Sequence, residues 1–293
     1  MIKNQLWEDC RDNPTSSVVI PLKDAARVQE WSAQQRQSRP QKPDPTVEGE
    51  RTNMVGQSWR LEVLADSGRM VQRGIELWQQ WAIEAIAERG FFSVALSGGG
   101  TPKVFYEALA SADLPWDKVY VFWGDERYVP ADHPDSNYRM AKEALLDRVP
   151  IPDPNVFPMP TQAGNPQADA DTYAKTLQQV FNSLLPTIDC TLLGVGGDGH
   201  TASLFPGTEA LQSESAVTVG NKDGDPRITL TYPALNASKR VVFWIAGAGK
   251  ADIVKTLLTE TVGLPAQGVN PDGDLIWICD RAAAAKLPLV GLS

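Results

Sequence analysis

From Trp59 onwards, short apolar runs alternate with longer segments in which apolar residues recur at helical spacing. The runs have the length of buried strands, and buried strands separated by helices are typical of a parallel sheet. The sequence therefore predicts an α/β fold, with a mostly parallel, Rossmann-like sheet and helices on both of its faces. The expected strands are 91–96, 119–123, 190–195, 241–246 and 275–279, the expected helices are 66–88, 137–147, 169–185 and 251–258, and 228–232 is expected in a hairpin or edge strand.

The first 53 residues differ from this pattern. They carry scattered charges and the proline-rich polar stretch 38–45, a composition typical of linkers and tails. We therefore expect residues 1–53 to form a polar, proline-rich N-terminal extension that is poorly ordered. Residues 54–293 are then expected to form a single α/β domain.

The charge balance limits the partners of the chain. Its formal net charge of −9 disfavours binding to nucleic acid or to anionic membranes, so we expect neither as a partner. An anionic substrate would instead need a local positive site. We find no apolar stretch long enough to cross a bilayer and no signal-peptide pattern, which favours a cytoplasmic protein.

Cysteine and histidine usage narrows the chemistry further. The three cysteines are odd in number and widely spaced, which does not indicate a disulfide framework. With two histidines, His133 and His200, and no Cys-x-x-Cys pair, a zinc site of His or Cys ligands is not expected. We expect no metal and no cofactor, although a carboxylate-bound magnesium ion stays open.

Glycine-rich and charged segments follow four of the expected strands, directly after Leu96, Trp123, Val195 and Ala246. In parallel sheets, ligands bind beyond the carboxyl ends of the strands. The four loops are therefore expected to converge on one site.

The first of these loops is Ser97-Gly98-Gly99-Gly100-Thr101-Pro102. Consecutive glycines allow backbone N–H groups to approach a phosphate, and the start of a following helix favours negative charge. Thr101 is expected to be the N-cap of that helix, with Pro102 in its first position. The order of residues is not that of a Walker A loop, and a turn used only for packing stays an alternative.

Two cations follow other strands. Arg127, in the segment 123–127, offers a bidentate grip on a phosphoryl group, but this segment alone favours an internal ion pair with Asp125 or Glu126. Lys250, in the turn 247–250, is a second candidate phosphate ligand. Its alternative is an exposed lysine at the start of a helix.

The segment 194–207 contains Asp198, Gly199 and His200. It matches Gly-x-Gly-x-x-Gly, but Pro206-Gly207 ends it before the long helix that a dinucleotide site requires. An imidazole on such a loop can take a proton from water, whereas a purely structural histidine is the alternative. His133 lies in a polar loop and is expected to be solvated.

Taken together and in this order, segments 97–102, 123–127 with Ser136-Asn137, 194–207, 227–230 and 247–250 resemble the 6-phosphogluconolactonase family. The resemblance covers residues 59–293 and implies the fold shared by glucosamine-6-phosphate deaminases, ribose-5-phosphate isomerases and coenzyme A transferases. Gly100 departs from the family's usual serine. The related deaminases carry a glutamate five residues after the histidine, where this chain has Phe205.

The resemblance implies a metal-free and cofactor-free hydrolase that opens 6-phosphogluconolactone to 6-phosphogluconate. His200 would be the general base, Asp198 would shape the loop or orient the base, and the phosphate would lie on the glycine loop, held by Arg127 and Lys250. A deaminase or isomerase of the same fold, and a non-catalytic sugar-phosphate sensor, are the alternatives, and a nucleotide-dependent oxidoreductase is more distant. A monomer or weak homo-oligomer is expected. The residues expected to bind the substrate are Ser97, Gly98, Gly99, Gly100, Thr101, Asp125, Arg127, Asn137, Gly199, Arg227 and Lys250.

Overall fold

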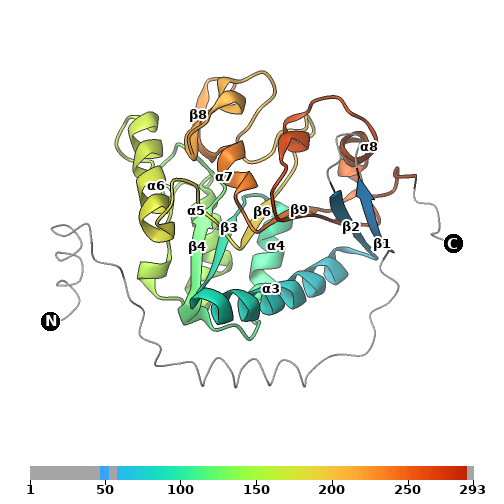
Figure 1. Cartoon of the computed structure of the whole chain (residues 1–293), viewed down its shortest axis with the longest axis horizontal. Coiled ribbons are helices and arrows are strands. Elements are labelled where there is room, and N and C mark those ends of the chain that lie inside the picture. Colours follow the sequence, from blue (N-terminus) through green and yellow to red (C-terminus); the bar gives the residue numbers. More distant parts are fainter. Residues whose placement is uncertain (1–46, 53–57, 289–293) are drawn as a thin grey trace. The chain divides into compact units, whose positions relative to one another are not determined.

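The computed structural model describes residues 47–52 and 58–288 (Figure 1). Its main sheet has the strand order β1-β2-β10-β9-β6-β3-β4 and is flanked by helices. All neighbouring strands from β2 to β4 in this order run parallel, and β1 is antiparallel to β2, so the predicted fold class is confirmed. The elements are β1 Val47–Thr52, β2 Ser58–Leu64, α3 Ser67–Arg89, β3 Phe92–Leu96, α4 Gly100–Leu109, β4 Val119–Trp123, β5 Asp125–Arg127, α5 Asn137–Ala144, α6 Pro166–Phe181, β6 Cys190–Leu193, β7 Val217–Lys222, β8 Asp225–Leu230, α7 Tyr232–Asn236, β9 Arg240–Ile245, α8 Ala251–Thr259 and β10 Asp274–Asp280.

The central strands form because every residue in them is covered. All five residues of β3 are buried, as are all four of β6, which is the pattern of strands covered on both faces. Helix α3 packs aromatic residues onto this sheet: the Trp78 ring meets those of Phe92 and Phe105 edge to face, with centroids 5.8 and 5.4 Å apart.

Helix α3 has a clear start and end. The side chain of Asp66 accepts a hydrogen bond from Arg69 N at 2.9 Å, which satisfies one of the free N–H groups of the first turn. At the other end, Gly90 has φ 88° and its N–H donates to Ile86 O. Such a left-handed residue favours glycine, so the sequence itself sets the length of the helix.

Strand β1 lies before residue 54, within the range expected for the extension. It pairs with β2 over six residues, from Val47 with Val63 to Thr52 with Ser58. Most of the expected extension, residues 1–46, lies outside the described residues. Within the described ranges, no helix is both long and apolar enough to span a membrane.

A second, three-stranded antiparallel sheet has the order β5-β8-β7. Residues 228–230 of the expected hairpin or edge strand lie in β8, which forms a hairpin with β7, whereas Tyr232 begins α7. Strand β5 pairs with the other edge of β8 and brings Arg127 opposite Arg227. This small sheet therefore carries charged residues of two distant segments to one place.

The strand order brings the four predicted loops together. Strands β9, β6, β3 and β4 are consecutive neighbours in the main sheet and all run parallel. Their carboxyl ends consequently share one edge, and the loops that follow them are adjacent. The four loops therefore follow neighbouring strands at one edge, as expected, and that they form one site stays a prediction.

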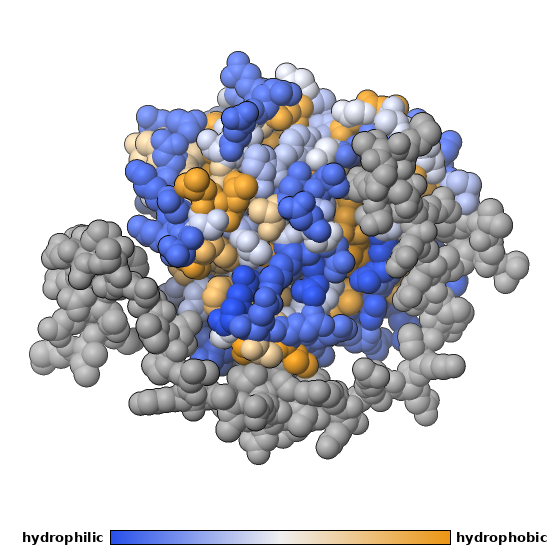
Figure 2. Space-filling model, in the orientation of Figure 1, coloured by the Kyte–Doolittle hydropathy of each residue, from blue (hydrophilic) through white to orange (hydrophobic). Residues whose placement is uncertain are grey.

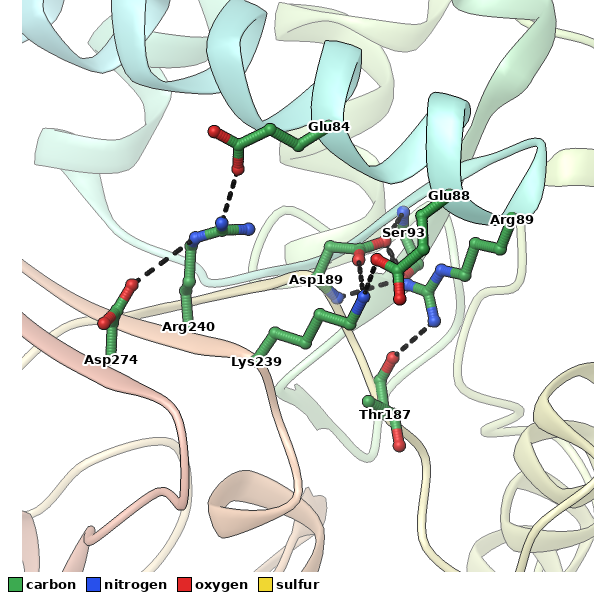
Figure 3. Close-up of polar contacts among 9 residues, drawn as sticks. All are labelled: Glu84, Glu88, Arg89, Ser93, Thr187, Asp189, Lys239, Arg240 and Asp274. Atoms are coloured by element: carbon green, nitrogen blue, oxygen red, sulfur yellow. Dashed lines mark hydrogen bonds and ion pairs between the residues drawn. The ribbon is translucent and has the colours of Figure 1, made fainter.

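The opposite edge, where these strands begin, carries a charged network (Figure 3). Asp189, with none of its surface exposed, accepts hydrogen bonds from Ser93 N and Ser93 Oγ, both at 2.9 Å. It also forms ion pairs with Arg89 at the end of α3 and with Lys239 before β9. Lys239 in turn pairs with Glu88. One buried carboxylate thus joins α3 to the beginnings of three strands.

We expect Asp189→Ala to lower the free energy of unfolding by about 2–4 kcal/mol, because it leaves the partly buried Arg89 and Lys239 without their shared partner. Urea unfolding of the full chain measures this loss. The matched control is Asp274→Ala, which removes an exposed partner of Arg240 in the same region and should cost less than about 1 kcal/mol. Equal midpoints for the two variants would contradict a structural role for Asp189.

Candidate active site

The glycine loop enters α4 without a side-chain cap. The N-cap is Gly99, whose φ of 110° favours glycine, and no side chain accepts a hydrogen bond from the first turn. The expectation that Thr101 is the N-cap is therefore wrong: the helix begins earlier, at Gly100. The glycine conformation starts the helix and leaves the N–H groups of its first turn available to an anion.

Two side chains complete this loop. Ser97 is 6% exposed, and its buried Oγ atom has no hydrogen-bond partner among the described residues. A Cβ atom on Gly98 would lie 1.9 Å from Oδ1 of Asn137. The absence of a side chain at position 98 therefore allows Asn137, at the start of α5, to pack against the loop.

Asp125 connects this loop to the histidine segment. Its carboxylate accepts a hydrogen bond from Ser203 Oγ at 2.6 Å, and its backbone oxygen accepts one from Asn137 Nδ2 at 2.8 Å. All three residues are buried. Asp125 thus links the histidine segment to the start of α5, and its Oδ2 atom already accepts a hydrogen bond from within the protein.

Glu126 holds the following loop. It is 3% exposed, and its carboxylate accepts hydrogen bonds from the backbone N–H groups of Arg127, Asn137 and Tyr138 and from Ser136 Oγ. Burial raises the pKa of Glu126, although these four hydrogen bonds act in the opposite direction. The Glu126 carboxylate therefore ties the end of β5 to the start of α5.

The guanidinium groups of Arg127 and Arg227 lie close together. Arg127 Nη1 donates to Asp135 O at 2.6 Å, and no ion pair forms with Asp125 or Glu126, which leaves the alternative explanation for this arginine without support. Burial, and then the neighbouring charge of Arg127, lower the pKa of Arg227. The Nε atoms of both arginines are buried without a partner among the described residues. Two adjacent, under-bonded cations favour a bound anion.

The histidine segment positions an imidazole beside a carboxylate. Nδ1 of His200 lies 2.5 Å from Oδ1 of Asp198, which also accepts the backbone N–H of His200. Burial raises the pKa of Asp198, but the hydrogen bonds from His200 outweigh it and the net pKa is lowered. The carboxylate therefore only accepts, so Nδ1 is the donor, and in the neutral imidazole Nε2 is the nitrogen that can accept a proton.

Glycines shape this segment too. A Cβ atom on Gly196 would lie 2.1 Å from Nδ1 of His200, and Gly199 has φ 79°. The segment forms turns rather than a helix, and the next helical element is the short 3₁₀ turn Glu209–Gln212. This geometry does not provide the long helix of a dinucleotide site.

Lys250 reaches the histidine segment from the 3₁₀ turn Ala248–Lys250, which follows β9. Its Nζ atom donates to Val195 O at 2.7 Å, which uses one of its three N–H donors. The turn before it is fixed because Gly247 N, at φ 94°, donates to the carboxylate of Asp280 at 3.0 Å. His133, by contrast, is not bonded to this segment: 42% of its side chain is exposed, and its Nδ1 accepts from Asp135 N.

Gly100 and Thr101 also line a largely apolar hollow. It lies where α3, α4 and the end of β9 meet, and no atom comes within 4 Å of a Cβ atom built on Gly100. The hollow is lined by Ser67, Met70, Val71, Gly100, Thr101, Val104, Trp244 and Ala246.

Among the described residues, no group of three or more His, Cys, Asp or Glu side chains is placed to hold a metal ion.

The sequence patterns missed two contacts of this site. Ser203 reaches Asp125 across 78 positions of sequence, which no local pattern reveals. Phe205 lies against His200, with ring centroids 4.5 Å apart. Its place in the histidine segment was the available signal, but its contact was not predictable from spacing.

The chain matches the sequence profile of the family described as glucosamine-6-phosphate isomerases/6-phosphogluconolactonase over residues 65–277. The chain belongs to this family. Relatives named 6-phosphogluconolactonase include proteins from Nostoc sp., 49% identical over 78% of this chain and 98% of the relative, and from Synechocystis sp., 47% identical with the same coverage.

Solved structures agree with this assignment. A 6-phosphogluconolactonase from Thermotoga maritima is 32% identical, with a TM-score of 0.68 over 75% of this chain and 98% of that chain. A monomeric glucosamine-6-phosphate deaminase is similar in fold, with a TM-score of 0.65 and 21% identity over 77% of this chain and 98% of that chain. The description of the family names both glucosamine-6-phosphate isomerases and 6-phosphogluconolactonase, and the more similar relatives carry the lactonase name.

We expect Gly98→Ala to lower the free energy of unfolding by about 1–3 kcal/mol, because the new methyl group displaces the buried Asn137 from Asp125. Gly100→Ala is the matched control, since its Cβ atom meets nothing within 4 Å, and it should stay within about 0.5 kcal/mol of the wild type. Urea unfolding compares the two. Similar losses at both positions would show that the close approach of Asn137 is unimportant.

Proposed function

We propose that this protein hydrolyses 6-phosphogluconolactone to 6-phosphogluconate, with water activated by His200. The observation that carries the proposal is the His200–Asp198 pair, 2.5 Å apart, on a loop at the shared carboxyl edge of the sheet. Membership of the family and relatives named 6-phosphogluconolactonase support the choice of substrate. The protein is proposed to act in the cytoplasm on this small molecule.

The hydrogen bonding of the imidazole indicates which of its nitrogen atoms acts as the base. With the proton on Nδ1 held by Asp198, Nε2 accepts a proton from water as its oxygen attacks the lactone carbonyl carbon. The same proton then passes to the ring oxygen as the carbon–oxygen bond breaks. Asp198 favours the imidazolium formed in between, because its lowered pKa keeps it negative.

The phosphate would lie where the under-bonded donors are. These are the buried Oγ of Ser97, the N–H groups at the uncapped start of α4, and the Nε atoms of Arg127 and Arg227. An anion satisfies all of them, whereas a neutral sugar leaves buried donors unpaired. The two arginines also provide the local positive site that an anionic substrate needs on a chain with a net charge of −9.

Other expected substrate contacts have supporting roles in this proposal. Asp125 and Asn137 are bonded to each other and to neighbouring loops, so they position the site. Gly199 provides the left-handed turn before His200. Lys250 keeps two donors beyond its bond to Val195 O, and these are available to the phosphate or to the lactone oxygens.

A deaminase of the same fold is the second candidate. The family name covers it, but the position five residues after His200 is occupied by Phe205, which is 5% exposed and carries no acid. The lactone reaction needs no second acid, since a lactone is already an activated ester. The lactonase is therefore the better match to these side chains.

The first experiment follows acid formation from freshly generated 6-phosphogluconolactone, with the spontaneous rate subtracted. We expect clear acceleration by the wild type, and a fall in kcat of about 10²-fold or more in His200→Ala, because a positioned base is commonly worth 10²- to 10⁴-fold. His133→Ala is the matched control and should leave kcat unchanged. No acceleration by folded wild-type protein would overturn the lactonase, and ammonia release from glucosamine 6-phosphate would then identify the deaminase.

We expect Arg127→Ala to raise KM for the phosphorylated lactone by about tenfold or more with a smaller change in kcat, because it grips the phosphate rather than the reacting carbonyl. Steady-state kinetics on the phosphorylated lactone measures this. Arg148→Ala, a cation after α5 and outside the site, is the control. An unchanged KM in Arg127→Ala would leave this arginine with a structural role only.

A further inference from the structure

One aromatic side chain contacts the two groups assigned to opposite ends of the substrate. The ring centroid of Phe205 lies 4.5 Å from that of His200, with the planes inclined by 42°. The Cζ atom of Arg227 lies 5.6 Å from the centroid of the same Phe205 ring. Phe205 is 5% exposed, so its ring is packed within the protein rather than in water.

Neither His200 nor Arg227 is fixed by hydrogen bonds alone. The His200 ring has one side-chain partner, Asp198, whose own side chain is 51% exposed. The guanidinium of Arg227 donates no hydrogen bond to another described residue, and its Nε atom is buried without a partner. A single bond to an exposed carboxylate leaves an imidazole free to tilt. Packing against a ring removes that freedom.

Phe205 itself is held firmly enough to serve as a support. Its backbone oxygen accepts Thr208 Oγ1 at 2.8 Å. Two residues earlier, Ser203 N donates to Thr229 Oγ1 at 3.1 Å, and Ser203 Oγ donates to Asp125. Thr229 lies in β8, the strand that also carries Arg227. The ring and the arginine are therefore parts of one hydrogen-bonded unit.

We propose that Phe205 is a positioning residue that fixes the distance between the general base and the phosphate-binding arginine. The inference rests on the proposed function, because it takes His200 as the base and Arg227 as a phosphate ligand. An aromatic face attracts a guanidinium and packs against an imidazole, so a single ring holds both. Loss of the ring should then weaken phosphate binding and proton transfer together.

The test compares Phe205→Leu and Phe205→Tyr, with the phosphorylated lactone and with the same lactone lacking its phosphate. We expect Phe205→Leu to lower kcat about fivefold to tenfold on both substrates, because His200 loses the ring that it packs against. KM should rise about fivefold to tenfold on the phosphorylated lactone only, because Arg227 loses the same ring. The preference for the phosphorylated lactone falls accordingly. Phe205→Tyr keeps the ring and should stay within about twofold of the wild type.

The control is Phe92→Leu, which removes a buried ring packed on Trp78 at the opposite edge of the sheet. It should lower stability without changing the preference between the two lactones. In an Arg227→Ala background, Phe205→Leu should raise KM no further, because the guanidinium that it supports is gone. Phe205→Met provides a second non-aromatic side chain if the leucine variant does not fold.

The outcomes separate the two proposals. Absence of turnover by the wild type overturns the proposed function itself. A wild type that depends on His200, together with a folded Leu or Met variant whose lactone preference and kcat match the wild type, overturns only the role of Phe205. Loss of preference in Phe205→Leu, with the preference retained in Phe205→Tyr and Phe92→Leu, supports it.

Discussion

Asp125 and Glu126 are adjacent carboxylates on a strand of three residues, and the arrangement of the site depends on both. Because neighbouring residues of a strand point in opposite directions, one carboxylate reaches Ser203 and the histidine segment while the other reaches the start of α5. Each is buried and each is satisfied by donors from elsewhere in the chain. Asp125 thus ties the loop after β4 to the segment after β6, and Glu126 ties the same loop to the start of α5.

The site shows a clear division between acceptors and donors. The buried carboxylates of Asp125 and Glu126 are occupied by protein donors, so they do not repel a ligand through unpaired acceptors. The unoccupied groups are instead donors: Ser97 Oγ and the Nε atoms of Arg127 and Arg227. Such an excess of donors matches an anion, and it explains how an acidic protein can offer a positive site. The face drawn in Figure 2 is largely hydrophilic, with hydrophobic residues in separate patches.

Much of this arrangement was predictable from sequence, because the strongest signals are local. The runs at β3, β4, β6 and β9 were recognisable as strands because no charged residue interrupts them, and parallel pairing then placed the glycine loops and Arg127 on one edge. Gly99 is different: its φ of 110° began α4 before Thr101, which propensity alone favoured as a cap. Contacts between distant segments, such as Ser203 with Asp125 and Arg227 with Phe205, depend on tertiary packing. No spacing rule could have supplied them.

The two edges of the main sheet have separate tasks. The Asp189 network closes the edge where the strands begin, and the loops with His200 and the paired arginines occupy the edge where the strands end. Since the connection between them is a rigid parallel sheet, the first edge is the side on which to attach a dye, a resin or a fusion partner. A protein molecule immobilised through that edge would keep its candidate active site exposed to the solution.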